Sequence, residues 1–498
     1  MSNQRDAAFG LSKQLLFDDA FIAERSGFAP TMNPAVRNGE PVLAPERPWE
    51  KRGCFAPTVL ADGDSYRMWY GAIGDDGVSR LCCAVSADGV RWERPDLGLI
   101  TYGGRATNIA EIDYTGGPNR GIAFTHHGSV FRDPVDRPER RYKMIFGGGQ
   151  YAFTSMYAGG ARFRYEKTLP AQWRYPGIGG AYSADGLRWT IYDHPIMPWY
   201  TDTANVAFWD ERLGRYVAYV RWNEYLRVVD GIQTGSFDYR AIGRAESADF
   251  ENFPAPEKIL EPDFDDPDDA DQWGGGLYDS AALQYAYAAD AYFFFIAAYH
   301  HTNDTLDIEL ATSRDGIRFT RWRQPFLRLG PNEAFDSKML YMGVGLAGGG
   351  GEIRQYYGGF DQLHDQASEA RYQPSIGLAR SRMDGFVSQD AGSSVSRLTT
   401  LPFTLEGDRL EINFDGSSRG WLKVELLDEN FAAVHGFTEG EADRLAGNDV
   451  RRGVTWGGRA DLAALRGRRL RLRFVGQSVK LYAFQFAVAS NERIGAKV

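Results

Sequence analysis

The chain has 498 residues, enough for more than one domain, and its 43% hydrophobic and 14% aromatic residues are typical of a globular protein. Its formal net charge of −10 argues against a nucleic-acid-binding surface, and no apolar stretch approaches the roughly 20 residues that span a bilayer. The three cysteines are too few for a disulfide framework and no signal-peptide pattern is visible, so we expect a cytoplasmic protein.

A nearly identical turn recurs five times, each time after a strand-like segment. The copies share a central aspartate, followed by glycine in four of the five, and occupy residues 86–92, 183–189, 247–250, 313–319 and 382–386. An Asp-Gly step tolerates the positive φ angles of a tight hairpin. A repeat of this size indicates one structural unit copied around an axis or along a solenoid.

Each repeat can be laid out as four strands, the last strand of the fifth repeat being placed at 386–388. Four strands in each of five repeats predict an all-β fold with a five-bladed β-propeller over residues 1–395. The alternative is two stacked β-sandwiches whose Asp-Gly turns coincide by chance.

The pattern changes after residue 395. Alternating segments such as 410–414 and 479–486 predict a compact C-terminal β-sandwich over residues 396–498. This sandwich is a candidate for glycan binding, for a structural buttress or for the contact of a homo-oligomer.

The innermost strand of each propeller blade lines the central axis, so its polar residues are the first candidates for chemistry. The carboxylates at or just before these strands are Glu50, Asp133, Asp279, Glu333 and Asp336. Carboxylates around one opening repel one another and raise at least one pKa, which is the pairing that glycoside hydrolysis requires. The alternative for each aspartate is a turn cap that accepts hydrogen bonds from neighbouring backbone N–H groups.

A family resemblance supports this interpretation. The repeated turns, the Phe131-Arg132-Asp133-Pro134 motif and the trailing sandwich resemble glycoside hydrolase family 32 and its relatives in families 43 and 130. The Pro41-Val42-Leu43-Ala44-Pro45 segment with Trp49-Glu50 resembles the approach to the first blade in that superfamily. The resemblance implies a propeller enzyme in which Asp133 stabilises the transition state and holds sugar hydroxyls.

The other two catalytic motifs of family 32 are absent from this sequence. In place of the Asn-Asp-Pro-Asn-Gly nucleophile motif, the candidates for nucleophile or base are Asp18, Asp19 and Glu50. In place of the Glu-Cys acid motif, the candidates for the acid are Glu224, Glu246 and Glu333. The sequence does not choose among them.

Sugar binding needs aromatic platforms and forked donors as well as acids. The substrate-binding candidates are Trp49, His126, Arg132, Arg221, Trp222 and Asp279, and Trp199 and Tyr278 also lie in or near loops. The pairs His126-His127 and His300-His301 raise the question of a metal, but neighbours on a strand point to opposite faces, and loop hydrogen bonding is the alternative. We expect neither a metal nor a cofactor.

These features predict a glycoside hydrolase or transglycosylase that acts on a furanoside or a short oligosaccharide. Its partner would be a carbohydrate, with no nucleic acid and no membrane. The alternatives are a non-catalytic carbohydrate-binding propeller, or a glycoside phosphorylase or lyase on the same fold. A phosphorylase should gather several Arg, Lys or His side chains beside the axial pocket.

Overall fold

The computed structural model describes residues 7–113, 128–147, 178–192, 194–199, 201, 204–229, 232–263, 276–288, 290–364 and 373–488, with the backbone alone at 113, 223–229, 232–239 and 279–280. The regular structure of these residues consists of β-strands and short 3-10 helices, without an α-helix, so the all-β prediction is confirmed. None of their helices has the length and apolar character needed to cross a bilayer.

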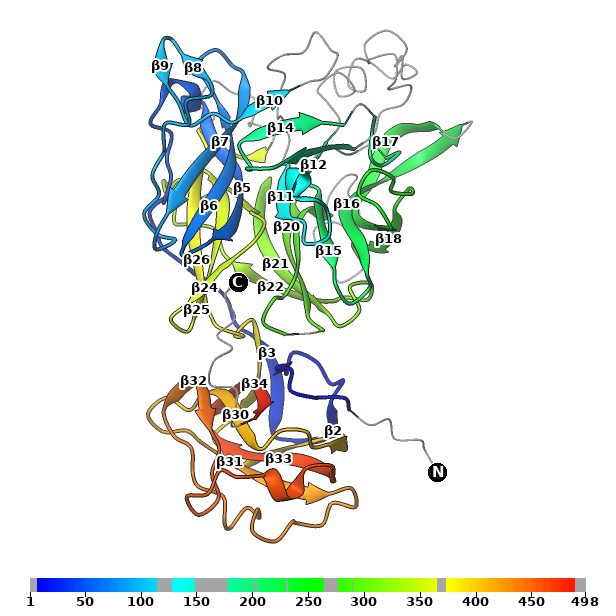
Figure 1. The fold of residues 1–498 in the computed structure, drawn as a ribbon, viewed down its shortest axis with the longest axis vertical. Helices are drawn as coiled ribbons and strands as arrows, with labels where there is room; N and C mark the ends of the chain where they lie inside the picture. The colour runs from blue at the N-terminus through cyan, green and yellow to red at the C-terminus, as the bar shows by residue number, and fades with distance from the viewer. Residues whose placement is uncertain are drawn as a thin grey trace.

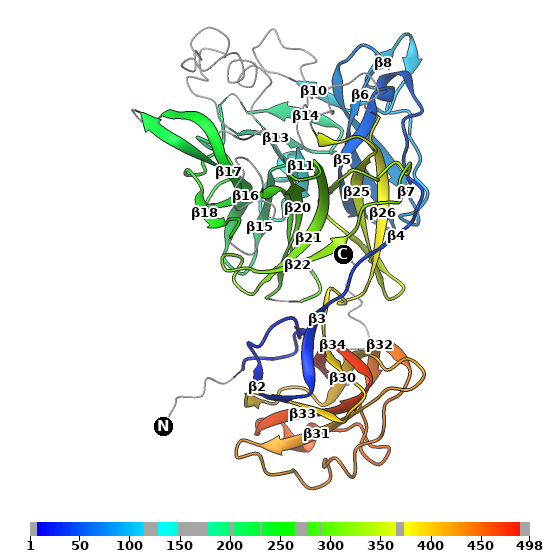
Figure 2. The same cartoon turned by 180° about the vertical axis from the view of Figure 1, so that it is seen from behind.

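Most strands fall into antiparallel groups that follow one another along the chain (Figures 1 and 2). Group 1 holds β5 (Gly53–Asp62), β6 (Ser65–Ile73) and β7 (Ser79–Ser86), with a bridge between Val85 and Glu93 at its edge. Group 2 holds β11 (Ser129–Arg132), β12 (Tyr142–Phe146), β13 (Gly179–Ser183) and β14 (Arg188–Ile191), with β10 (Glu111–Asp113) beside β14. Group 3 holds β15 (Val206–Asp210), β16 (Arg215–Val229), β17 (Ile232–Ser247) and β18 (Glu257–Leu260).

Two further groups complete this unit. Group 4 holds β19 (Gly276–Gln284), β20 (Tyr292–His300), β21 (Thr305–Ser313) and β22 (Thr320–Leu327). Group 5 holds β23 (Met339–Met342), β25 (Glu352–Phe360) and β26 (Ser375–Arg382), with β24 (Ala347–Gly349) and β4 (Val36–Arg37) beside them. The short elements between groups are η1 (Pro48–Glu50), β8 (Thr101–Tyr102), β9 (Arg105–Ala106) and η2 (Pro138–Arg140).

The groups contact one another in sequence, and the last contacts the first. Parallel bridges join β17 to β19 and β21 to β23, and a bridge between Thr58 and Val344 joins group 1 to group 5. The Val130 N–H donates to Thr58 Oγ1 at 3.4 Å, which links groups 1 and 2. A closed ring of this kind is the arrangement of a β-propeller, and the count of five blades stays a prediction.

The repeated turns have the same internal hydrogen bonds in groups 1, 2 and 4. The serine hydroxyl accepts from the glycine N–H at 2.8–2.9 Å, and the aspartate Oδ1 accepts from the next two N–H groups at 2.8–2.9 Å. The three glycines have φ angles of 70°, 74° and 72°, a conformation that glycine adopts without strain.

Each of these turns is also bound by an aromatic side chain from the second strand of a neighbouring group. The donors and carbonyl acceptors are Tyr356 to Gly89 at 2.6 Å, Trp69 to Gly186 at 2.6 Å and Tyr219 to Gly316 at 2.8 Å. The recurring turn therefore holds successive groups together.

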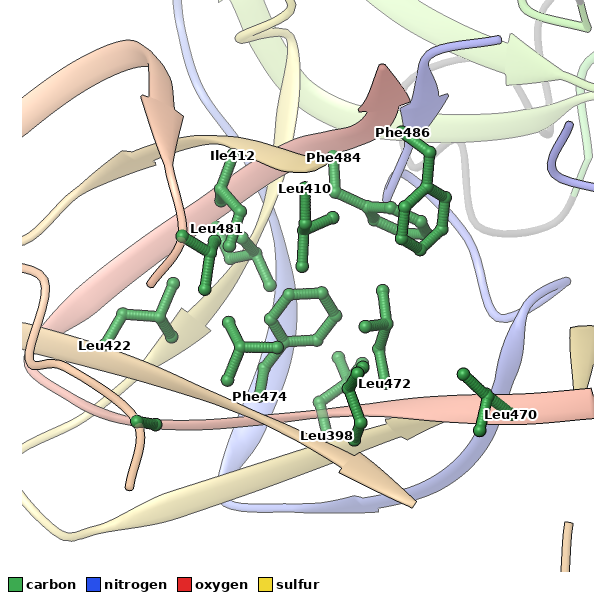
Figure 3. Packing of buried hydrophobic residues seen from close by; sticks show 14 of the residues in the cluster. Leu398, Leu410, Ile412, Leu422, Leu470, Leu472, Phe474, Leu481, Phe484 and Phe486 are labelled. Atoms are coloured by element: carbon green, nitrogen blue, oxygen red, sulfur yellow. The ribbon is translucent and has the colours of Figure 1, made fainter. Parts of the chain in front are cut away.

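The remaining strands form a two-sheet sandwich around a separate apolar core, part of which is seen in Figure 3. One sheet holds β1 (Gln14–Leu15), β3 (Phe28–Met32), β27 (Val387–Ala391), β34 (Val479–Ala487), β30 (Arg409–Asp415) and β32 (Asn448–Gly453). The other holds β2 (Ile22–Ser26), β28 (Ser396–Thr400), β33 (Arg469–Gln477), β29 (Phe403–Thr404) and β31 (Trp421–Asp428), and η5 (Ala463–Leu465) lies near by in sequence. Leucine and phenylalanine side chains such as Leu410, Leu422 and Phe474 fill the space between the sheets (Figure 3).

The start of the chain belongs to this sandwich. Strands β1, β2 and β3 pair with β34, β28 and β27, and in Figure 1 the dark blue β3 lies in the same unit as the orange and red strands. These N-terminal strands fall within 1–395, the range predicted for the propeller. The boundary at residue 395 therefore stays a prediction for the point at which the C-terminal part of the sandwich begins.

The fifth group obtains its outer strand from the opposite end of the chain. Of residues 386–388, expected to be that strand, 387 and 388 begin β27 of the sandwich, and β4 pairs with β26 instead. Because β4 leads along the chain into group 1, this pairing ties the last group to the first. The local turn pattern could not reveal a partner that lies more than 300 residues away.

Candidate functional site

Side chains of groups 3, 4 and 5 converge on the ring of Tyr278. The guanidinium carbons of Arg221 and Arg240 lie 4.4 and 4.7 Å from the ring centroid. The rings of Tyr299, Tyr341 and His364 have their centroids 6.1, 5.9 and 4.9 Å away. Together with Asp304, which contacts two of these side chains, they are called the Tyr278 cluster: Arg221, Arg240, Tyr278, Tyr299, Asp304, Tyr341 and His364.

The strands bring the cluster together through pairings between neighbouring groups. The parallel bridge between Arg240 and Gly276 places β17 beside the start of β19, two residues before Tyr278. Within β19, the register with β20 shifts between Leu277 and Asp279, so that Tyr278 lies in a bulge. Bulges re-aim a side chain and are frequent next to active sites. The irregular strand thus presents Tyr278 to the three groups.

A histidine and a carboxylate adjoin the Tyr278 hydroxyl. His364 Nε2 lies 2.9 Å from Tyr278 Oη, and His364 Nδ1 lies 4.0 Å from Asp304 Oδ1. The Tyr299 hydroxyl donates to the same Asp304 oxygen at 2.7 Å. The side chains of His364 and Asp304 are 20% and 19% exposed, so a ligand can reach them.

Two tryptophans lie beside Arg221. The rings of Trp199 and Trp222 are 4.6 Å apart with an angle of 32° between their planes, and Trp199 Nε1 donates to the Arg221 carbonyl at 3.0 Å. Both rings are half-buried. Half-buried indole rings with an anchored N–H offer the amphipathic surface on which a sugar face can pack.

Asp133, the residue given most weight by the family resemblance, lies just after the end of β11 and is 3% exposed. Its Oδ1 accepts from the N–H groups of Val135 and Asp136 at 3.0 and 3.3 Å, and its Oδ2 accepts from the Tyr216 hydroxyl at 2.8 Å. Burial, together with this hydrogen bond, raises the pKa of Tyr216. Asp133 therefore caps a turn and links group 2 to group 3.

Asp210, at the same place in group 3, has the same set of contacts. Its Oδ1 accepts from the N–H groups of Arg212 and Leu213 at 3.0 and 3.1 Å, and its Oδ2 accepts from the Tyr292 hydroxyl of group 4. A carboxylate contact that recurs in successive groups matches the turn-capping alternative for Asp133.

Asp133 and Arg221 lie toward opposite ends of the strands. The hydroxyl of Tyr216, near the start of β16, reaches Asp133, whereas Arg221 is five residues further along the same strand. Five residues of extended strand cover about 17 Å of backbone. Asp133 and Arg221 therefore adjoin different parts of β16.

Glu50 and Trp49 lie in η1, at the entry to group 1, and both are buried. Glu50 accepts from Tyr70 Oη at 2.6 Å and from Arg94 Nε at 2.8 Å. The Trp49 indole donates to Asn108 Oδ1 at 2.9 Å. Both predicted side chains are thus held within group 1, and Trp49 is only 4% exposed.

Asp336 and Glu333 lie in the segment between groups 4 and 5. Asp336 is fully buried, where it accepts from Arg37 Nη1 at 3.0 Å and from the Tyr357 hydroxyl at 2.7 Å. Glu333 is exposed and has a φ angle of 73°, in the left-handed region.

The remaining N-terminal and strand-end candidates lie at the surface. Asp19 is 63% exposed and pairs with Arg25 at 2.7 Å, and Asp18 pairs with Arg314 at 2.9 Å. Arg132, at the end of β11, is exposed. Glu246 is half-exposed and pairs with Arg244 at 2.6 Å.

Three predicted site residues are not described at the side-chain level. His126 lies outside the described residues, and Glu224 and Asp279 are described by their backbone in β16 and β19. Within the described ranges, no group of three or more His, Cys, Asp or Glu side chains could hold a metal ion.

Five residues of the Tyr278 cluster were not named in advance: Arg240, Tyr299, Asp304, Tyr341 and His364. Tyr299, Asp304 and His364 lie at or just beyond the ends of β20 and β25, whereas Arg240 lies within β17 and Tyr341 within β23. The sequence signal is polar residues at the end of the second strand of a repeat, such as His300-His301 at the end of β20 and His364 after β25.

No protein-family model matches the chain, and no curated protein matches it. Solved structures that are similar to it include one described as a glycoside hydrolase, with 15% identity, covering 71% of this chain and 93% of that one, at a TM-score of 0.46. Another comes from work on the GH130 family of mannoside phosphorylases, which contains glycoside hydrolases that target β-1,2 mannosidic linkages in Candida mannan (15% identity, 74% and 97% covered, TM-score 0.44). A third is a glycoside hydrolase family 43 arabinoxylan arabinofuranohydrolase from Bacillus subtilis (12% identity, 90% and 99% covered, TM-score 0.40).

With identities of 12–15% and TM-scores below 0.5, no activity is transferred from these structures to this chain.

Proposed function

We propose that the chain cleaves or transfers glycosidic bonds of a furanoside or short oligosaccharide at the Tyr278 cluster. The observation that carries this proposal is the convergence of two guanidinium groups, two tyrosine rings and a histidine–aspartate pair on one half-buried tyrosine. Sites for small polar ligands combine apolar and aromatic walls with a few fixed polar groups. The Trp199–Trp222 pair beside Arg221 extends such a wall.

A glycosidase needs carboxylates, and two lie on the strands that carry this cluster. Asp279 directly follows Tyr278 on β19, and Glu224 comes three residues after Arg221 on β16. We therefore favour Asp279 and Glu224 as the acid and base candidates. Glu50 and Asp336 are less favoured because each is buried with an arginine and a tyrosine hydroxyl elsewhere.

The transition-state role that the family resemblance implies for Asp133 is weighed against a turn cap. Its contacts, which Asp210 repeats, support the turn cap. We therefore assign Asp133 a structural role as a turn cap. Substituting Asp133 and measuring stability and turnover separately distinguishes this role from transition-state stabilisation.

The test is a screen of purified protein against aryl-glycosides and natural oligosaccharides, with released sugar measured by chromatography. The proposal predicts release of sugar from at least one furanoside or short oligosaccharide. Saturable glycan binding without release would favour the non-catalytic alternative. Neither binding nor release over the panel would contradict a carbohydrate function.

A second candidate is phosphorolysis, because the cluster gathers Arg221, Arg240 and His364 around one ring. Guanidinium groups bind phosphate through paired hydrogen bonds. The same screen, run with and without inorganic phosphate, distinguishes the two reactions. A hydrolase releases free sugar in both cases, whereas a phosphorylase requires phosphate and releases a sugar phosphate.

We also propose a reducing, cytoplasmic compartment. Cys54, Cys82 and Cys83 are all buried and free, and burial raises the pKa of each thiol. Mass spectrometry of protein from its natural host, with thiols alkylated before lysis, would find these three cysteines reduced; oxidised thiols would contradict the proposal.

A further inference from the structure

We propose that a pocket beside η1, in group 1, binds one neutral sugar unit of a glycan, apart from the Tyr278 cluster. This inference rests on the proposed glycosidic function and adds a second site for the same class of ligand. The pocket has a volume of about 240 Å³ and lies between η1, residues 94–96 and residues 105–108. Sites for drug-sized ligands occupy about 300–1,000 Å³, so a pocket below this range suits a single sugar ring.

Buried polar side chains line the inner part of this pocket, and they hold one another in place. Asn108, which is 1% exposed, donates to the Tyr70 hydroxyl at 2.7 Å and to the Cys83 carbonyl at 2.8 Å. Its Oδ1 accepts from Trp49 Nε1 at 2.9 Å. A site whose groups are fixed before the ligand arrives loses less entropy on binding. Trp49, a substrate-binding candidate from the sequence, thus belongs to a preorganised surface.

A guanidinium group of fixed orientation lies next to these side chains. The Arg94 side chain is 8% exposed. Its Nε donates to Glu50 Oε1 at 2.8 Å, its Nη1 to Glu46 Oε2 at 3.2 Å and its Nη2 to the Ala44 carbonyl at 2.5 Å. The Glu46 side chain is 62% exposed, so an acceptor lies at the pocket beside the arginine donor. A hydroxyl group both donates and accepts, and adjacent sugar hydroxyls therefore match such a pair.

The charges around the pocket balance, which decides the class of ligand. Three arginines and two carboxylates line the pocket, and one further carboxylate, buried, pairs with an arginine: Arg47, Arg94 and Arg105, Glu46 and Asp96, and Glu50. An anionic ligand gains no net attraction from three positive and three negative groups. A neutral sugar uses both kinds of group, because its hydroxyls accept from guanidinium groups and donate to carboxylates.

The pocket and the Tyr278 cluster lie at the same end of the ring. η1 directly precedes β5, the first strand of group 1, and Tyr278 lies at the start of β19, the first strand of group 4. The other end of β19 faces the sandwich, because Tyr285 donates to Asp384, which also accepts from Asn413. In Figure 1, β8 and β9 lie at the end of the ring away from the sandwich. A glycan bound at the Tyr278 cluster can therefore extend toward the pocket over this end.

The test fills the pocket without removing any of its side-chain hydrogen bonds. Ala106 of β9 is exposed and lines the pocket, so Ala106→Phe occupies the space that a sugar would take. The probes are the methyl glycosides of glucose, mannose, galactose, arabinose, xylose and fructose, with glucuronate as the anionic counterpart. The readout is the indole N–H resonance of Trp49 in protein with isotope-labelled tryptophan, identified by its loss in Trp49→Phe.

At least one neutral methyl glycoside should shift the Trp49 resonance saturably, and Ala106→Phe should raise its Kd at least about tenfold, the equivalent of one lost charge-assisted hydrogen bond. Arg105→Gln, which removes a guanidinium group without adding bulk, should also weaken binding. The matched control is Ala184→Phe, at an exposed alanine between β13 and β14, and it should bind with unchanged affinity. Circular dichroism and cleavage of an aryl-glycoside verify the folding of each variant.

The outcomes separate this inference from the proposed function. If oligosaccharides are cleaved but no neutral methyl glycoside shifts the Trp49 resonance, or Ala106→Phe binds as tightly as the unmodified protein, the pocket is not a sugar site and the proposed function stands. A shift with glucuronate alone overturns the neutral ligand. If nothing is cleaved while a neutral glycoside shifts the resonance and Ala106→Phe weakens it, the pocket binds sugar and the proposed function fails.

Discussion

Replacing Asp133 tests whether this residue stabilises the fold or takes part in catalysis. In Asp133→Ala, the N–H groups of Val135 and Asp136 and the hydroxyl of Tyr216 all lose their acceptor. Lys143, which is 1% exposed, also loses a carboxylate at 3.9 Å. Each of these donors lies in or next to a buried contact between groups 2 and 3.

The expected cost follows from these contacts. Removing one partner of a buried charged pair costs about 3–5 kcal/mol, and we expect Asp133→Ala to fall in that range. Asp133→Asn keeps a carbonyl oxygen as acceptor for the two N–H groups, but it places an NH2 donor where Oδ2 accepts from the Tyr216 hydroxyl. Because a buried hydroxyl left without its acceptor costs about 1–3 kcal/mol, we expect Asp133→Asn to cost about that much.

The assay is urea unfolding followed by tryptophan fluorescence, with Asp210→Ala and Asp210→Asn as the matched pair from group 3. The turn-cap assignment predicts similar losses of unfolding free energy at the two positions. It is refuted if Asp133→Asn unfolds like the unmodified protein and yet loses turnover while Asp210→Asn keeps it. That result would restore the transition-state role implied by the family resemblance.

Two further predictions concern the repeated turns. Gly186→Ala should destabilise the protein more than Gly63→Ala. Both glycines have positive φ angles, so the backbone strain is shared. A Cβ at Gly186 would lie 2.7 Å from Trp69 Cζ2, whereas a Cβ at Gly63 would have no atom within 4 Å. The left-handed backbone alone costs about 1–2 kcal/mol, so equal unfolding midpoints for the two variants would contradict the packing argument. The pKa of Asp88 is held below its usual range by the N–H groups of Arg91 and Val90, so its contribution to stability is present above pH ~4 and is lost as the pH falls through the lower folded pKa. Urea midpoints measured from pH 6 to pH 2.5 should therefore fall less steeply in Asp88→Asn, and an unchanged slope would contradict the linkage.

The strands and turns were largely predictable because their signals are local. The aspartate of each turn has a defined task, which is to accept two backbone N–H groups, and Asp-Gly steps identify it in the sequence. The outer strand of group 5 was misplaced because β4 pairs with β26 across most of the chain. Pairing between distant segments leaves no mark in a local pattern.

The candidate site was predicted only in part, for a related reason. Arg221, Trp222 and Tyr278 were identified from residue type and proximity to loops, and the structure brings Arg221 and Tyr278 into contact. Asp133 attracted attention because of a short motif, but a motif does not tell at which end of a strand its side chain lies. His364 and Asp304 lie 60 residues apart and meet only through the pairing of groups 4 and 5.

The most direct test of the central claim is oligosaccharide cleavage by Tyr278→Ala and Asp133→Asn, measured beside the unmodified protein. If the Tyr278 cluster is the site of glycosidic chemistry, Tyr278→Ala loses cleavage and glycan binding, whereas Asp133→Asn cleaves the substrate with an unchanged KM. Cleavage that survives in Tyr278→Ala and disappears in a folded Asp133→Asn would contradict the account.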